Sequence, residues 1–458
     1  MYRSKRKAFL ALIIVMLVIC SFFNNPMTAS ANSSETTASV AADEATLKKC
    51  TADYINQFIN NNFDEFYQSA TKKAQQQITA SVLKQGWDML IGITGKPGKV
   101  ISSTYTQQDG VHIVSERLEG TLYDIIITIT YLSDGHPDGI HITFAPKNPP
   151  KPQSTKKWKE CPVTVGKNKL PGMLTLPKGV KKPPVIIMIQ GSGSSDMNES
   201  FGTTPNRMFE DIAHGLANQG VATLRYNKRT YQYPFVAEVT IEYEMLEDAA
   251  SAVKLLSKDT RIDTNQIYLL GHSLGGMLAP KITADNPKIK GFISMAGTLR
   301  PLEDVIYDQD KAAADAETSL SEQQKSIYLE QVKADVNRVK NLDSCNVSSL
   351  FNMPINYWKS LNAIDRIPLV KKLKVPMLIM QGAADFQVYP DKDFKLWKTT
   401  LKNHKNVTYR LYEGLSHMFM TNQISENGAP DITLYNAPNH VDPSVINDIA
   451  IWVKKIKK

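Results

Sequence analysis

The chain has 458 residues, of which 42% are hydrophobic and 21% are charged, and its formal net charge is +8. Such a composition is ordinary for a globular protein with a sizeable core, and the length favours more than one domain. Half of the net charge comes from four basic side chains among the first seven residues. The remaining charge is small and scattered, so no nucleic-acid partner is expected.

The first 31 residues have the pattern of a secretory signal peptide. Residues 1–7 are basic, residues 8–20 form an apolar run that is short for a membrane span, and residues 29–31 read Ala-Ser-Ala. We predict cleavage after Ala31 and therefore a secreted or cell-surface protein without stable membrane insertion after cleavage. Lipidation at Cys20 is the alternative, although the bulky residue before it departs from lipoprotein signals.

A second module precedes the main domain. Residues 32–45 are rich in Ser, Thr and Ala and read as a flexible leader, and residues 46–144 pass from helical periodicity, including one stretch at 72–91, to alternating strands. Helices followed by strands predict an α+β domain. The order resembles the cone-shaped domains of the nuclear transport factor type. Prolines in 145–155 predict a stiff linker. The module either narrows an active-site mouth, binds a polymer or stabilises the protein.

Residues 266–276 read QIYLLGHSLGG, an apolar strand-like run that breaks into Gly-His-Ser-Leu-Gly before a helix-like segment. This context is typical of a nucleophile elbow, where a serine sits on a strained turn with its hydroxyl exposed. Larger residues at Gly271 or Gly275 would collide with neighbouring backbone. We therefore predict Ser273 as the nucleophile, with Gly271, His272 and Gly275 forming the elbow. The alternative is an ordinary loop of the same composition.

Two further polar residues follow apolar strands downstream. Residues 375–385 end in a Gly-Ala-Ala-Asp turn, which predicts the Asp385 carboxylate at the carboxyl end of a strand, and residues 407–417 end in a short loop that carries His417. A serine nucleophile needs a base, and the base needs an orienting acid. The order serine, aspartate, histidine is the one found in α/β hydrolases. We predict Asp385 as the acid and His417 as the base, and Asp391 is the competing acid.

An oxyanion hole is predicted from another strand end. Residues 184–193 are the most apolar strand after the leader, and they end in Gln-Gly-Ser-Gly. Backbone N–H groups in such a turn can face a developing oxyanion, together with the N–H of the residue after the nucleophile. We assign the donors to Leu274 and Ser192, with Gly193 as the near alternative to Ser192.

These four motifs together resemble the α/β hydrolases of the esterase, dienelactone-hydrolase and prolyl-oligopeptidase-like group. The resemblance covers about 156–458 and implies an α/β fold with a doubly wound, mostly parallel sheet. Alternating strand-like and helix-like segments agree with this expectation. The insertion at about 299–366 is expected to form a helical cap. In it, Tyr357 and Trp358 either line an acyl pocket or pack the cap onto the body.

Residues 225–230 read Arg-Tyr-Asn-Lys-Arg-Thr. Many secreted relatives of this group have Arg-Tyr-Asp-Lys-Arg-Gly there, so the motif survives with two departures. We interpret the segment as structural, and the alternative is that Lys228 or Arg229 touches the substrate.

The resemblance implies a serine hydrolase that cleaves carboxylic esters, or thioesters, through an acyl-enzyme, with a small-molecule ester as its substrate. A serine peptidase of the prolyl-oligopeptidase-like group is the first alternative, and a noncatalytic cell-surface binding protein is the second. No cofactor and no metal are expected, since the widely spaced Cys50, Cys161 and Cys345 give no metal signature. One disulfide among them is possible but not required. The sequence leaves the acyl group, the alcohol and the oligomeric state open.

Overall fold

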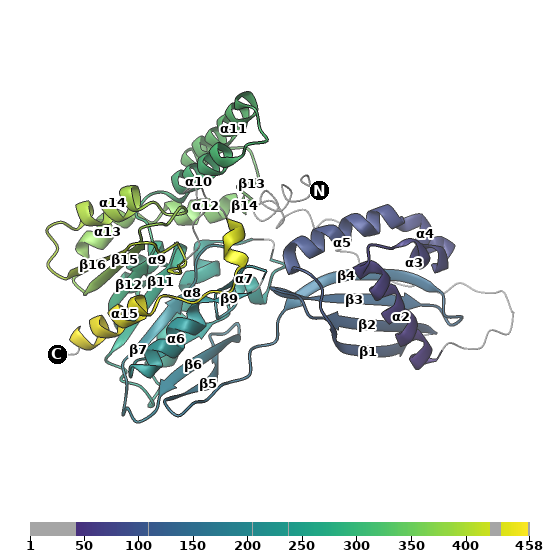
Figure 1. The fold of residues 1–458 in the computed structure, drawn as a ribbon, viewed down its shortest axis with the longest axis horizontal. Coiled ribbons are helices and arrows are strands. Elements are labelled where there is room, and N and C mark those ends of the chain that lie inside the picture. Colours follow the sequence, from purple (N-terminus) through teal and green to yellow (C-terminus); the bar gives the residue numbers. More distant parts are fainter. Residues whose placement is uncertain (1–42, 109, 204, 237, 422–431, 457–458) are drawn as a thin grey trace. The chain divides into compact units, whose positions relative to one another are not determined.

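The computed structural model describes residues 43–108, 110–203, 205–236, 238–421 and 432–456. The predicted signal peptide and all but the end of the flexible leader lie outside the described residues. The chain divides into two compact units, one up to Asn148 and one from Pro149, which are described separately below (Figure 1). None of the helices in the described ranges combines the length and the apolar composition that a membrane crossing requires.

The described part of the first unit begins with helices. Their bounds are α2 (Glu44–Ile59), α3 (Asp64–Ser69), α4 (Lys72–Gln77) and α5 (Ala80–Thr94). The prediction of one helical stretch over 72–91 is wrong, because the backbone is extended at Ile78 and a new helix begins after Thr79. The hydroxyl of Thr79 accepts a hydrogen bond from the N–H of Val82, which caps α5.

Four antiparallel strands follow in the spatial order β1-β2-β3-β4. Their bounds are β1 (Val100–Gln108), β2 (Val111–Leu118), β3 (Tyr123–Tyr131) and β4 (Pro137–Pro146). Alternate side chains of β3, from Ile125 to Tyr131, are fully buried in a core shared with α2, α3 and α5. The Tyr131 hydroxyl is tied to Thr51 of α2 over 2.7 Å. This unit therefore has a hydrophobic core of its own.

The second unit is built on an eight-stranded sheet in the order β16-β15-β12-β11-β7-β10-β6-β5. The bounds are β5 (Trp158–Val165), β6 (Leu170–Pro177), β7 (Val185–Ile189), β10 (Ala222–Tyr226), β11 (Ile267–His272), β12 (Ile289–Met295), β15 (Met377–Gly382) and β16 (Val407–Tyr412). Within this sheet the pairs from β10 to β16 are parallel, and β6 pairs antiparallel with both of its neighbours. The predicted mostly parallel sheet is confirmed.

Helices cover both faces of this sheet (Figure 1). Along β7 the side chains of Val185, Ile187 and Ile189 enter one core, while Ile186 and Met188 enter the other. A strand that is apolar on both faces is typical of a buried parallel sheet. One face is covered by α6 (Met208–Asn218) and α15 (Pro443–Ile456), and the other by α8 (Glu247–Leu256), α9 (Leu274–Asp285), α13 (Arg366–Lys372) and α14 (Lys395–Thr400).

A mostly helical insertion separates β12 from β15. It contains α10 (Leu302–Ala316), α11 (Glu322–Lys340), η3 (Leu342–Ser344), β13 (Ser349–Leu350), β14 (Met353–Pro354) and α12 (Ile355–Asn362). Tyr357 and Trp358 of α12 are 2% and 0% exposed, and the Trp358 indole donates to the carbonyl of Leu350 over 2.9 Å. Both side chains therefore pack the insertion onto the body, as the second of the two interpretations expects, and neither is exposed to line a pocket.

Short elements complete the unit. They are β8 (Ser200–Phe201), β9 (Asn206–Arg207), α7 (Arg229–Gln232), the π-helical turns η2 (Glu242–Leu246) and η4 (Pro390–Phe394), and the 3-10 turn η5 (Ile432–Asn436). Cys50, Cys161 and Cys345 are free thiols in the described residues, so the optional disulfide does not form.

Candidate active site

The nucleophile elbow joins β11 to α9. Ser273 lies between them in a left-handed conformation, with φ 52° and ψ −114°, and its N–H donates to the carbonyl of Met295 over 2.8 Å. Such backbone strain in a residue other than glycine persists only where the surrounding structure enforces it. A Cβ on Gly271 would lie 2.1 Å from the carbonyl oxygen of Gly275, and one on Gly275 would lie 2.4 Å from that of Ile189. The steric reason predicted for the two glycines is confirmed.

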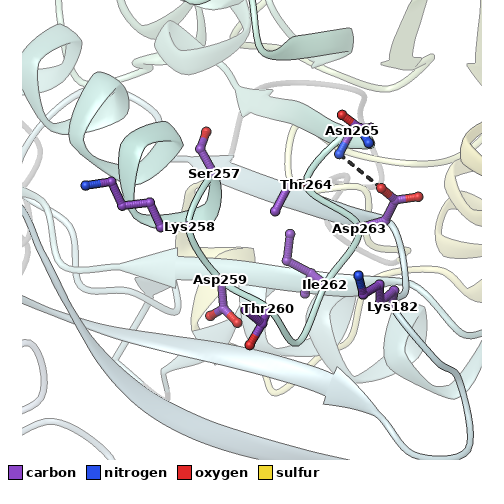
Figure 2. Close-up of a pocket in the computed structure, with 9 residues that line it drawn as sticks. All are labelled: Lys182, Ser257, Lys258, Asp259, Thr260, Ile262, Asp263, Thr264 and Asn265. Atoms are coloured by element: carbon purple, nitrogen blue, oxygen red, sulfur yellow. Dashed lines mark hydrogen bonds between the residues drawn. The ribbon is translucent and has the colours of Figure 1, made fainter.

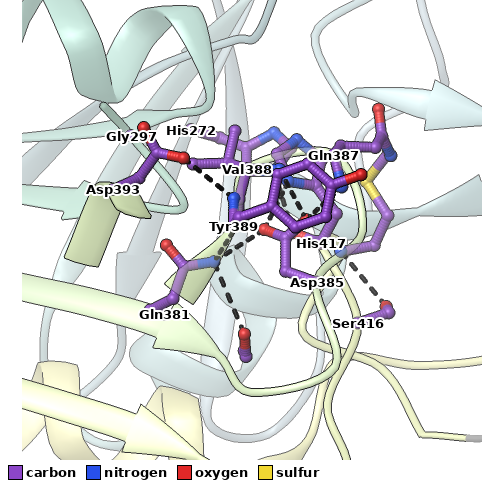
Figure 3. Close-up of polar contacts among 12 residues, drawn as sticks. His272, Gly297, Gln381, Asp385, Gln387, Val388, Tyr389, Asp393, Ser416 and His417 are labelled. Atoms are coloured by element: carbon purple, nitrogen blue, oxygen red, sulfur yellow. Dashed lines mark hydrogen bonds and ion pairs between the residues drawn. The ribbon is translucent and has the colours of Figure 1, made fainter. Parts of the chain in front are cut away.

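Asp385 and His417 come together at the ends of two neighbouring strands. Asp385 follows β15 and His417 follows β16, and His417 Nδ1 lies 2.7 Å from Asp385 Oδ2 (Figure 3). The two residues are 4% and 3% exposed, respectively. Asp391, the competing acid, is exposed in η4. The geometry favours Asp385 over Asp391 as the partner of the histidine.

The Asp385 carboxylate receives a full set of donors. Besides His417, its oxygens accept from the N–H groups of Gln387 and Val388 at 2.8 and 2.9 Å and from the Gln381 amide at 2.7 Å. Figure 3 shows Gln381 and His417 approaching the same carboxylate. Several hydrogen bonds to a buried carboxylate fix its orientation and offset the cost of its burial.

The Ser273 hydroxyl has no hydrogen-bond partner in the described residues, and its side chain is partly exposed. The structure therefore brings Asp385 and His417 into contact and leaves the serine hydroxyl free. Catalytic hydrogen bonds are often formed or shortened only when substrate is bound.

The loop over residues 190–194, called the oxyanion loop below, follows β7 and approaches the elbow. A Cβ on Gly191 would lie 3.2 Å from Ser273 Cβ. The N–H groups of Ser192 and Gly193 have no hydrogen-bond partner in the described residues, and both residues are exposed. The N–H of Leu274, in the first turn of α9, has no partner within its helix either. The predicted donors are therefore available to bind an oxyanion.

His272 and Glu199 form a buried pair beneath the elbow. Glu199 Oε1 accepts from the N–H of Gly191 at 2.6 Å and lies 2.9 Å from His272 Nδ1, while His272 Nε2 lies 3.1 Å from the carbonyl oxygen of His417. Both ring nitrogens face oxygen atoms that accept hydrogen bonds, an arrangement that favours the doubly protonated form of His272. Burial alone lowers the pKa of His272, but the Glu199 carboxylate outweighs it and raises the pKa above 6.5.

Sequence reasoning missed Glu199 and Gln381. Gln381 gave a usable signal, because it is a polar residue at the end of an otherwise apolar strand. Glu199 gave none, because it lies in a loop and meets His272 only through the tertiary fold.

All of these groups lie at one edge of the sheet. Gly191, Ser273, Asp385 and His417 each follow the carboxyl end of one of the parallel strands. Ligands of open α/β sheets bind outside this edge. A separate pocket of about 300 Å³, lined by Lys182 and Asp263 among others, lies beside the amino ends of β7 and β11, opposite the elbow (Figure 2).

Glu160, Glu210 and His214 are close enough together to hold a metal ion. Arg225 already lies among them, because its guanidinium donates to Glu160 and lies 3.8 Å from Glu210 Oε1. His214 also bonds Glu160 over 2.8 Å. The arrangement is therefore a partly buried ion network, in which the arginine supplies the positive charge.

Comparison with known proteins identifies the family. A model of the serine aminopeptidase S33 family matches residues 205–423. Esterase EstD of Thermotoga maritima is 30% identical over 406 residues, which span 88% of this chain and 94% of EstD. The chain belongs to the α/β-hydrolase family of esterase EstD. It is accordingly a hydrolase of carboxylesterase type.

Solved structures were also compared. Est1E of Butyrivibrio proteoclasticus, bound to ferulic acid, has a TM-score of 0.42 and 19% identity, over 65% of this chain and 100% of that chain. The 2,6-dihydroxy-pseudo-oxynicotine hydrolase has a TM-score of 0.40 and 17% identity, over 65% and 68% of the two chains.

Proposed function

We propose that this esterase hydrolyses carboxylic esters, or thioesters, of small molecules through Ser273, His417 and Asp385. The observation that carries the proposal is the 2.7 Å contact between His417 Nδ1 and Asp385, at the same edge of the sheet as the strained Ser273. A carboxylate on Nδ1 orients the imidazole and stabilises its charged form, so Nε2 is the nitrogen that takes the proton of the serine.

The reaction proceeds in two steps, acylation of Ser273 and deacylation by water. Ser273 Oγ attacks the ester carbonyl as His417 takes its proton, and the tetrahedral oxyanion receives hydrogen bonds from the N–H groups of Leu274 and Ser192. The alcohol leaves with the proton from His417, and Ser273 remains acylated. Water then attacks the acyl-enzyme as it gives a proton to His417. When the second tetrahedral intermediate collapses, His417 returns that proton to Ser273 Oγ, which releases the acid and restores the serine hydroxyl.

The proposal extends to location. A basic, apolar and small-residue pattern over 1–31 supports export with cleavage after Ala31, and the enzyme would then act on esters outside the cytoplasm. Mass spectrometry of the N-terminus of the exported protein tests this part, and an intact 1–31 segment on it would contradict it.

A panel of p-nitrophenyl esters of increasing acyl length, with aminoacyl p-nitroanilides beside it, tests the activity. We expect kcat/KM to be far higher for the esters. Faster cleavage of the anilides would instead favour a peptidase, the activity named in the family description that matches residues 205–423. If neither the esters nor the anilides were hydrolysed and a fluorophosphonate did not label Ser273, the noncatalytic alternative would be favoured.

A further inference from the structure

Lys228 is a buried lysine directly behind the oxyanion loop. It follows β10 and is 2% exposed. Its ammonium donates to the carbonyl oxygens of Gly191 at 2.6 Å and Gly193 at 2.9 Å, and to Glu244 Oε1 at 2.6 Å. An ammonium has three N–H donors, so all of them are used. The Glu244 side chain, in the π-helical turn η2, is also 2% exposed and balances the charge.

The two carbonyl contacts fix the direction of two peptide planes. Every described peptide bond is trans, so the C=O and N–H groups of one plane point in opposite directions. Because the carbonyl of Gly191 points to Lys228, the N–H of Ser192 in the same plane points away from Lys228. The N–H of Gly191 itself donates to Glu199. The Ser192 N–H is thus directed by its neighbours and left without a partner.

The positive charge of Lys228 also polarises the peptide groups whose carbonyl oxygens it binds. A cation on a carbonyl oxygen polarises the amide, which makes the N–H of that plane a stronger donor. Lys228 does not hold the carbonyl of Ser192, whose plane carries the N–H of Gly193. The contacts therefore favour Ser192 over Gly193 as the upstream donor.

We propose that Lys228 is a positioning residue of the oxyanion hole, whose ammonium holds the carbonyls of Gly191 and Gly193 so that the Ser192 N–H faces the developing oxyanion. The proposal rests on the function proposed above and extends it. The role is distinct from both earlier interpretations of Lys228, because the side chain neither touches substrate nor serves packing alone.

Lys228→Met tests the proposal, because it keeps the apolar stem and removes the ammonium. Loss of one oxyanion-hole donor costs about 10²-fold or more in kcat, so we expect kcat to fall by about 10² with little change in KM. A trifluoromethyl ketone, which forms an oxyanion on the serine, should bind about 10²-fold more weakly. Active-site titration with a fluorophosphonate corrects for any inactive fraction.

Two further variants keep the test decisive. Lys228→Met with Glu244→Gln leaves no unpaired buried charge, and it should show the same losses if the single variant fails to fold. Arg229→Met is the matched control, since Arg229 is the adjacent buried cation and binds Asp248 rather than the oxyanion loop. It should lose thermal stability while the kcat of the correctly folded enzyme and the affinity for the ketone stay unchanged.

Wild-type kcat and ketone affinity in either Lys228 variant would overturn the proposal. Equal losses of kcat and ketone affinity in Arg229→Met and Lys228→Met would also overturn it. Failure of the underlying function is recognised separately, because the wild-type enzyme would then neither be titrated by the fluorophosphonate nor bind the ketone.

Discussion

At the scale of single residues, the hydrogen bond between Asp385 and His417 identifies Asp385 as the acid of the triad. Asp385→Asn should lower kcat by about four decades, because an amide cannot stabilise the imidazolium and favours the wrong tautomer of His417. Asp391→Asn changes the same functional group six residues further on but on an exposed side chain, and should be nearly silent. Steady-state kinetics on one p-nitrophenyl ester measures both. A larger loss at Asp391 would show that the acid has been assigned to the wrong aspartate.

The buried His272 makes stability depend on pH. Its pKa is raised when the protein folds, so its stabilising contribution is fully present below about pH 6.5 and is lost as the pH rises through the raised pKa. Glu199→Gln removes the carboxylate that raises this pKa. We expect the difference in unfolding free energy between wild type and Glu199→Gln to be largest near pH 6 and to shrink at higher pH.

Denaturant unfolding at a series of pH values measures this difference. The groups that face His272 are Glu199, the carbonyl of His417, the imidazole of His417 with its ring centroid 4.8 Å away, and, more distantly, Asp385. A difference between wild type and Glu199→Gln that grows above pH 7 would mean that His272 is neutral in the folded protein.

At the scale of elements, the elbow depends on close backbone approach. Gly275→Ala places a methyl group against the carbonyl of Ile189, which cannot move without disturbing β7, so we expect a loss of about 1–3 kcal/mol in stability. Gly92→Ala in α5 is the contrast, because nothing lies within 4 Å of its added Cβ and alanine favours the helix. Thermal inactivation should be faster than in the wild type for Gly275→Ala and no faster than in the wild type for Gly92→Ala. Equal inactivation rates for Gly275→Ala and wild type would show that the elbow tolerates the methyl group.

A functional residue can be predicted from the sequence where its motif and the strand that positions it lie in one short segment. The elbow around Ser273 and the turn before Asp385 each combine an apolar strand with a local motif, so their elements could be predicted. Glu199 and Glu244 could not, because their partners, His272 and Lys228, come from distant segments that only the folded sheet brings together. The break after Gln77 was also missed, because apolar residues continue at helical spacing across Ile78.

At the scale of the whole molecule, the two units have separate cores. A cut within the predicted linker over 145–155 should leave Gln153 on the hydrolase unit. The N–H and the carbonyl of Gln153 both form hydrogen bonds with Glu160 of β5, and a cut after residue 155 would remove them. A fragment of residues 149–458 should therefore fold and retain hydrolysis of short activated esters, and a fragment starting at 156 should melt at a lower temperature. Thermal melts and the ester panel measure both. An insoluble or inactive 149–458 fragment would show that the hydrolase unit depends on the first unit.

The central claim is that Ser273 is the nucleophile. The most direct test is peptide mapping by mass spectrometry after reaction with a fluorophosphonate. We predict a single phosphonyl adduct on the peptide that contains Ser273, complete loss of ester hydrolysis with that labelling, and neither labelling nor hydrolysis in a folded Ser273→Ala variant. Labelling of another residue, or wild-type labelling and hydrolysis in Ser273→Ala, would contradict the account.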